Sequence, residues 1–229
     1  MERFRNIVAA IDFSETSGEV VRTALALVRD DGHVCLLHAV PHAIQTPWVV
    51  DASGADVNEL QRQWVAEAEM QLITLAATMR LDPRRVSVEV LVGPAAFEIV
   101  RHAGERGADL IVVGSHGRGA LRRFLLGSVA ERVLREAGCP VMIVPDRALR
   151  VTATEVRTLR TAAAGARGAD LLVLGSHGHG VIRRFLLGSV AERVLREAGC
   201  PVMIVPDRVF RATAVEALAL RGAGSGNVA

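Results

Sequence analysis

Lysine is absent from this sequence of 229 residues, so every basic side chain is an arginine. This absence excludes the Walker-type phosphate loop, in which a lysine ammonium contacts the phosphates, and catalysis through a lysine Schiff base. Tyrosine is also absent and aromatic residues make up only 3%, which leaves little surface on which unpaired bases could stack. The net charge is +2 and the arginines are spread along the chain, so the sequence shows no nucleic-acid-binding tract.

Long apolar runs are missing too. No segment approaches the ~18 to 20 consecutive apolar residues that a membrane-spanning helix needs, and residues 1–6 lead into a strand pattern without the features of a signal peptide. The three cysteines, Cys35, Cys139 and Cys200, form no C-x-x-C pair. They fit small buried side chains in a reducing compartment, and the expected location is the cytoplasm.

Apolar runs alternate with amphipathic segments over the first 147 residues. The runs are too continuous for strands that are solvated on one face, which is typical of a parallel sheet covered by helices on both sides. The sequence therefore predicts an α/β fold with a doubly wound, five-stranded parallel sheet. The expected strands are 7–11, 34–40, 86–92, 110–113 and 141–144, and the expected helices are 14–29, 56–80, 94–104 and 128–137.

A glycine pattern follows the fourth of these strands. Gly114 ends the strand, Gly117 comes three residues later, and Gly127-Ser128 stands where a helix begins. Glycines at the carboxyl end of a strand let a ligand approach the backbone without meeting a Cβ atom. A helix amino terminus exposes unpaired N–H groups and a partial positive charge, which favour phosphate. The spacing therefore predicts a loop that binds the phosphates of a nucleotide.

Residues 122–147 recur unchanged as residues 183–208, and weaker similarity extends to the segments just before them. The second half of the predicted domain is thus present twice, whereas its first three strands are present once. We expect a domain at 1–147, a partial repeat at 148–208, and a short helix with a flexible tail at 209–229.

Three features together resemble the universal stress protein family: Asp12 with Phe13-Ser14-Glu15 after the first strand, the glycine pattern, and Val-Pro after the fifth strand. The resemblance covers residues 3–147 and, in part, about 164–206. It implies the strand order 3-2-1-4-5 of the adenine nucleotide alpha hydrolase-like fold. It also implies a site for ATP, or for AMP or ADP, at the carboxyl ends of strands one and four, where Mg²⁺ could accompany the phosphates. This location agrees with the rule that ligands bind at a topological switch point.

The resemblance also implies roles for seven residues. Asp12 would contact the adenosine moiety, and the backbone of Val40 the edge of adenine. The remaining five would line the ribose and phosphate path or hold the phosphate at the helix start: Gly114, Gly117, Gly127, Ser128 and Val129.

Plainer interpretations stay open. Asp12 could cap the turn that follows it, and the glycine loop could be structural, which would make the chain a protein-interaction module. His116 could contact phosphate or be an ordinary loop residue. The sequence shows no nucleophile–base–acid set, so any ATP hydrolysis is expected to be slow.

The partial repeat has no counterpart of Asp12 or Val40 and leaves an apolar strand edge to be covered. Strand 202–205 could pair antiparallel with strand 141–144, and this would imitate within one chain the dimer contact typical of the family. Alternatively, the repeat could recruit a second chain and form a homodimer, or it could replace the first copy. We favour pairing within the chain, because it needs no exchange of segments.

Overall fold

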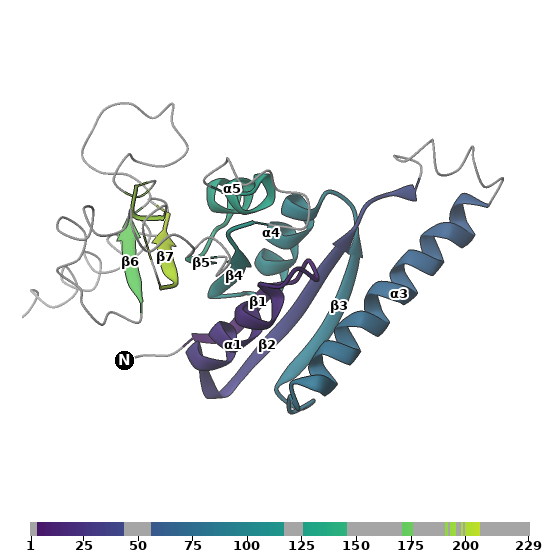
Figure 1. Ribbon diagram of the computed structural model, residues 1–229, viewed down its shortest axis with the longest axis horizontal. Helices are drawn as coiled ribbons and strands as arrows, with labels where there is room; N and C mark the ends of the chain where they lie inside the picture. Colours follow the sequence, from purple (N-terminus) through teal and green to yellow (C-terminus); the bar gives the residue numbers. More distant parts are fainter. Residues whose placement is uncertain are drawn as a thin grey trace, which may run out of the picture.

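The computed structural model describes residues 4–43, 56–116, 126–145, 171–175 and 200–206, together with residues 191, 193–195 and 198. Seven strands form one sheet in the order β3-β2-β1-β4-β5-β7-β6 (Figure 1). The first five are parallel to one another and have the predicted order 3-2-1-4-5, which is confirmed. The strands are β1 (Phe4–Ala10), β2 (Val28–Val40), β3 (Val86–Val92), β4 (Leu110–Gly114), β5 (Val141–Val144), β6 (Leu172–Gly175) and β7 (Val202–Val205).

Helices cover both faces of the sheet. Helices α1 (Ser17–Leu27) and α3 (Val57–Thr78) lie on one face, and α4 (Ala95–Glu105) and α5 (Ser128–Glu136) lie on the other (Figure 1). The side-chain period of two along each strand produces this division. In β4, for example, Leu110 and Val112 join the core under α1 and α3, whereas Ile111 and Val113 join the core under α4 and α5. Within the described part of the chain, no helix has both the length and the apolarity that crossing a bilayer requires.

The first helix is shorter than predicted at both ends. Ser14 does not cap it, because its hydroxyl donates to the carboxylate of Asp12 at 2.6 Å, and the helix begins at Ser17 after Thr16. At the other end β2 begins at Val28, a β-branched residue that is 3% exposed in the core. Most of the connection between the second strand and the helix after it, residues 41–55, and the whole tail 209–229 lie outside the described residues.

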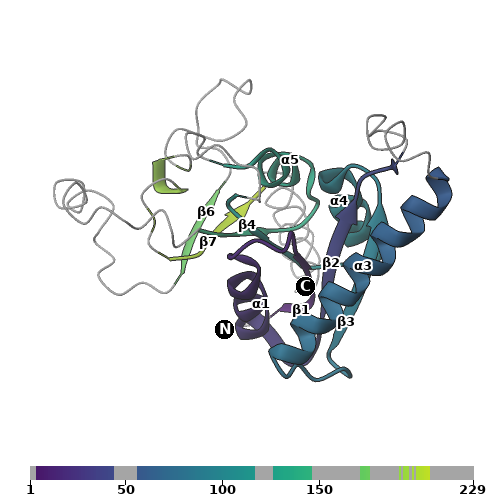
Figure 2. The same ribbon diagram turned by 45° about the vertical axis from the view of Figure 1, so that its right-hand side comes forward.

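Strand β7 of the repeat pairs antiparallel with β5 (Figure 1), so the arrangement favoured from the sequence is confirmed. Strands β7 and β6 thus extend the sheet on the side away from β3 (Figure 2). The pairing is symmetric with respect to the duplication. The first residue of β5 faces the copy of the third, the third faces the copy of the first, and the residue between them faces its own copy. The paired residues are Val141 with Ile204, Met142 with Met203, and Ile143 with Val202. A local two-fold axis therefore passes between the two equivalent methionines, and the geometry is that of an isologous interface built within one chain.

The register between β1 and β2 is irregular near the start of both strands, where Phe4 faces Val28 but Asn6 faces His33. The extra residues of β2 bring Gly32 against β1. A Cβ atom on Gly32 would lie 2.7 Å from the backbone oxygen of Arg5 and 2.7 Å from Cγ2 of Val28. Only glycine fits there without a shift of the backbone.

We expect Gly32→Ala to lower the free energy of unfolding by about 1 to 3 kcal/mol, because the backbone oxygen of Arg5 has to move. The matched control is Gly104→Ala in α4, where a Cβ atom meets nothing within 4 Å. That change should raise the free energy of unfolding by roughly 0.5 to 1 kcal/mol, because alanine restricts the unfolded chain and favours helix. Urea unfolding of the two variants measures both changes in the free energy of unfolding. Equal unfolding midpoints would contradict the conclusion that only glycine fits at position 32.

Candidate functional site

The candidate site lies where the strand order reverses, between the carboxyl ends of β1 and β4. Ala10 of β1 faces Val113 of β4 in the parallel register. Gly114 directly follows Val113, and Asp12 comes two residues after Ala10, so the sheet brings them to the same edge. The sequence places them about a hundred residues apart, and the β1–β4 pairing joins them.

The carboxylate of Asp12 organises the turn after β1. Its Oδ1 accepts hydrogen bonds from the backbone N–H of Ser14 at 3.0 Å, from the hydroxyl of Ser14 at 2.6 Å and from the hydroxyl of Ser17 at 3.1 Å. Among the described residues, no group donates a hydrogen bond to Oδ2. Asp12 therefore caps the turn, as the plainer interpretation proposed, and its second oxygen remains available to a ligand.

Phe13, which the sequence marked only as part of a motif, and His38, which it did not single out, hold this turn in place. Phe13 has a φ of 59°, in the left-handed region that a bulky residue rarely adopts. Its ring packs against the ring of His38 with centroids 4.5 Å apart, and Nδ1 of His38 lies 2.7 Å from the carbonyl oxygen of Ile11. The contacts of His38 with the Phe13 ring and with Ile11 thus hold the strained backbone at Phe13 in place. Backbone strain of this kind is common at binding sites. The cluster of hydroxyls after Asp12 was the only sequence signal for this arrangement.

Gly114 lies against the turn that Asp12 organises. A Cβ atom on Gly114 would be 3.5 Å from Cγ2 of Thr16 and 3.4 Å from the backbone oxygen of His116. A side chain of even one carbon on Gly114 would therefore be in van der Waals contact with the turn. The ends of β1 and β4 therefore form one continuous edge.

Helix α5 begins at the same edge. The N–H of Gly127 donates to the carbonyl oxygen of Ser115 at 2.7 Å, and the N–H of Ser115 donates to Val144 at 2.8 Å. These bonds bring the start of the helix next to the end of β4. Gly127 occupies the N-cap position and has no side chain to cap the helix, and no other described side chain caps it, while Ser128 and Val129 are exposed. The first N–H groups of α5 are thus open to an anion.

Val40 lies at the end of β2, next to this edge, and is 5% exposed. Its carbonyl oxygen accepts a hydrogen bond from the N–H of Gly93 at 2.9 Å, so only the second lone pair of that oxygen is left for a ligand. Gly117 lies outside the described residues. The structure thus brings Asp12 and Gly114 together with the start of α5, and it places Val40 beside them.

The described residues give little support for covalent catalysis. Burial raises the pKa of the Cys35 thiol to about 11, so this cysteine is protonated at neutral pH and is a poor nucleophile. The three cysteines form no disulfide. His116 is half-buried, and its Nδ1 lies 3.1 Å from the hydroxyl of Ser115.

Comparison with known proteins places this geometry in context. The family model described as the universal stress protein family matches residues 3–145 and 146–206. Universal stress protein G of Escherichia coli O157:H7 is 34% identical over 143 residues, which is 62% of this chain and 99% of that protein.

Two solved structures are similar. One is protein MJ0577 of Methanocaldococcus jannaschii, with a TM-score of 0.54 and 28% identity over 64% of this chain and 99% of that chain. The other is protein PA1789 of Pseudomonas aeruginosa PAO1, with a TM-score of 0.59 over 93% of this chain and 96% of that chain. At 14% identity the second likeness concerns the fold alone.

We expect Asp12→Ala to lower the free energy of unfolding by about 2 kcal/mol, because three donors lose a charged acceptor. Asp12→Asn keeps an oxygen acceptor at the same place and should lower the free energy of unfolding by about 1 kcal/mol or less. Urea unfolding of both variants measures the difference. Equal stability of Asp12→Ala and the unchanged protein would show that the carboxylate does not hold the turn.

Proposed function

Because the chain belongs to the universal stress protein family, we propose that it binds an adenine nucleotide, ATP or its relatives AMP and ADP, and acts in stress response or signalling. The single observation that carries the proposal is the uncapped amino terminus of α5 beside the Asp12 turn. An anion and a nucleoside can be bound there together, since the two features share one edge of the sheet.

The phosphate would bind to the first N–H groups of α5. Gly127 presents no side chain in front of them, and its own N–H is already bound to Ser115. The donors left are the backbone groups of Ser128 and Val129, in a nine-residue helix whose dipole favours negative charge. A phosphate oxygen would supply the cap that Gly127, with no side chain, does not.

The adenosine moiety would bind across the edge, near the turn after β1. Oδ2 of Asp12 can accept hydrogen bonds from the ribose hydroxyls, because Oδ1 alone serves the turn. The second lone pair of the Val40 carbonyl can accept one from the adenine amino group. Mg²⁺ would enter with the phosphates, since it keeps several waters and needs few protein ligands.

One complete site per chain follows from the duplication. In this proposal residues 1–147 form the whole domain, and residues 148–208 form a partial copy without counterparts of Asp12 and Val40. The copy contributes β7, which covers the edge of β5. We propose that this intrachain contact replaces a homodimer contact at the same edge.

Gly127→Asp should raise the free energy of unfolding and weaken nucleotide binding. An aspartate at the N-cap satisfies the N–H groups of α5 itself and repels phosphate. We expect an affinity for ATP at least about tenfold weaker, measured by calorimetric titration, and a higher urea midpoint for the same variant.

The matched control is Gly188→Asp, which makes the same change at the equivalent position of the repeat. It should leave binding unchanged, because the repeat lacks the adenosine side of a site. The absence of saturable ATP binding by the unchanged protein would overturn the proposal, and so would full affinity in Gly127→Asp.

The chain should be a monomer of 24.5 kDa by light scattering, because β7 already occupies the edge of β5. Met203→Asp places a charge at the centre of that pairing and should release the edge, so that a species of twice the mass forms as concentration rises. Val173→Asp, at a 56% exposed position of the neighbouring β6, is the control and should stay monomeric. A dimer of the unchanged chain at low concentration would contradict the expectation.

A further inference from the structure

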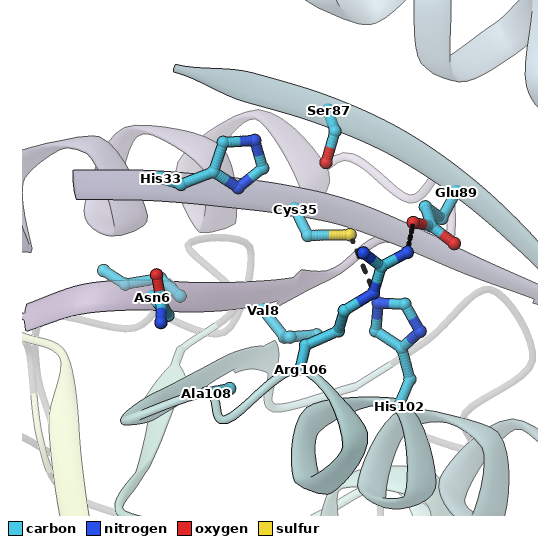
Figure 3. A pocket seen from close by; sticks show the side chains of 10 residues that line it. Asn6, Val8, His33, Cys35, Ser87, Glu89, His102, Arg106 and Ala108 are labelled. Atoms are coloured by element: carbon cyan, nitrogen blue, oxygen red, sulfur yellow. Dashed lines mark hydrogen bonds and ion pairs between the residues drawn. The ribbon is translucent and has the colours of Figure 1, made fainter. Parts of the chain in front are cut away.

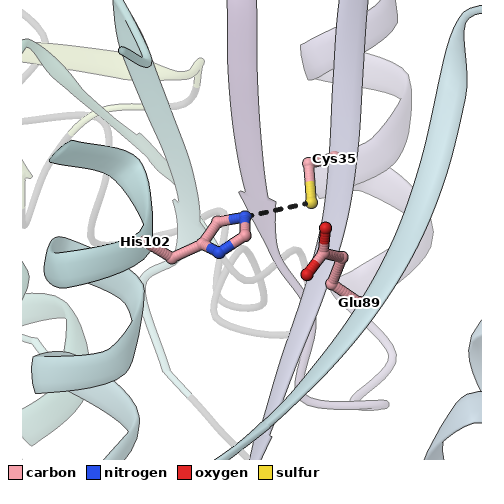
Figure 4. Close-up of side chains that lie close together, drawn as sticks. All are labelled: Cys35, Glu89 and His102. Atoms are coloured by element: carbon pink, nitrogen blue, oxygen red, sulfur yellow. Dashed lines mark hydrogen bonds between the residues drawn. The ribbon is translucent and has the colours of Figure 1, made fainter. Parts of the chain in front are cut away.

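A second group of chemistry-bearing side chains lies under α4, away from the candidate nucleotide site. Cys35 comes from β2, Glu89 from β3 and His102 from α4, and the three point toward one another (Figure 4). One sulfur, one carboxylate oxygen and one ring nitrogen all lie within 4.8 Å of one another. Cys35 is five residues before Val40, so about 16 Å of strand separates the group from the nucleotide edge.

The spacing of the two best-defined atoms matches metal coordination. Sγ of Cys35 and Nε2 of His102 are 3.6 Å apart. Two ligands of a tetrahedral Zn²⁺ at about 2.3 Å (sulfur) and about 2.0 Å (nitrogen) stand roughly 3.5 Å from each other. A thiol is only a weak hydrogen-bond donor, so the contact by itself contributes little to the stability of the fold.

The surroundings leave room for a further ligand. The three residues line a pocket of about 200 Å³, together with polar groups of His33, Ser87 and others (Figure 3). Arg106 donates to Oε1 of Glu89 at 2.5 Å, which orients the carboxylate and leaves its other oxygen for a cation. Such a contact to a ligating carboxylate is usual around metal sites.

We infer that Cys35, Glu89 and His102 form a site for a divalent cation of the zinc class, with water or a small ligand from the pocket as the fourth ligand. Sulfur and nitrogen ligands favour Zn²⁺ over the hard cations Mg²⁺ and Ca²⁺, which take oxygen ligands. Binding replaces the S–H bond of Cys35 by a sulfur–metal bond and releases that proton to solvent. The thiolate then offsets part of the charge of the cation, and the Glu89 carboxylate is shared between the cation and Arg106.

Co²⁺ is the probe that tests the site, because a thiolate ligand gives it a near-ultraviolet charge-transfer absorption. The full-length protein carries Cys139→Ser and Cys200→Ser, so that Cys35 is its only thiol. We expect one Co²⁺ per chain with this absorption, and its loss when Zn²⁺ is added. Cobalt bound without the charge-transfer absorption, or no bound cobalt, would overturn the inference.

Three variants in the same background separate coordination from folding. Cys35→Ser should abolish the absorption, and Glu89→Gln should weaken Co²⁺ binding about tenfold or more while leaving the fold intact, because its side chain is 29% exposed. His33→Gln, which changes the pocket lining outside the group of three, should bind as the background does. Equal affinity in Glu89→Gln and His33→Gln, with unchanged circular dichroism, would rule out the carboxylate as a ligand and overturn the three-residue site.

Discussion

The pairing of β1 with β4 is the constraint on which the candidate nucleotide site depends. The chain builds β1, β2 and β3 in one direction across the sheet and then returns to place β4 on the other side of β1. Two strand ends whose connections lead away in opposite directions leave a crevice between them. At this switch point Thr16 of the turn after β1 lies close to Gly114, and α5 begins nearby at Gly127, which has no side chain to cap it.

A second constraint is the edge of the sheet. An apolar edge strand such as β5 is a template for pairing with another strand. The duplicated segment covers this edge within the chain, because its strand β7 pairs with β5. As an exact copy of β5, β7 carries the self-complementary pattern that an isologous contact needs. Met142 and Met203 meet at the centre, and the apolar core continues across the junction to Val202 and Ile204.

The group of Cys35, Glu89 and His102 has a different origin. Each residue comes from a different element, and each is unremarkable in its own segment: a cysteine in an apolar strand, a glutamate in an alternating one, a histidine in an amphipathic helix. Metal-ligand patterns in a sequence are visible when ligands are a few residues apart. Here β2–β3 pairing and the packing of α4 create the proximity, so no local pattern indicates it.

The sequence by itself determined the alternation of strands and helices, the glycine pattern before α5 and the copy of β5, because periodicity and repetition are local properties. It also indicated Asp12 as a site residue, through its position after β1. The tertiary structure decided which oxygen of Asp12 serves the turn, that Phe13 and His38 hold it, where α1 begins and ends, and that β7 lies against β5. These depend on hydrogen bonds and packing between segments distant in the chain, and such contacts exist only after folding.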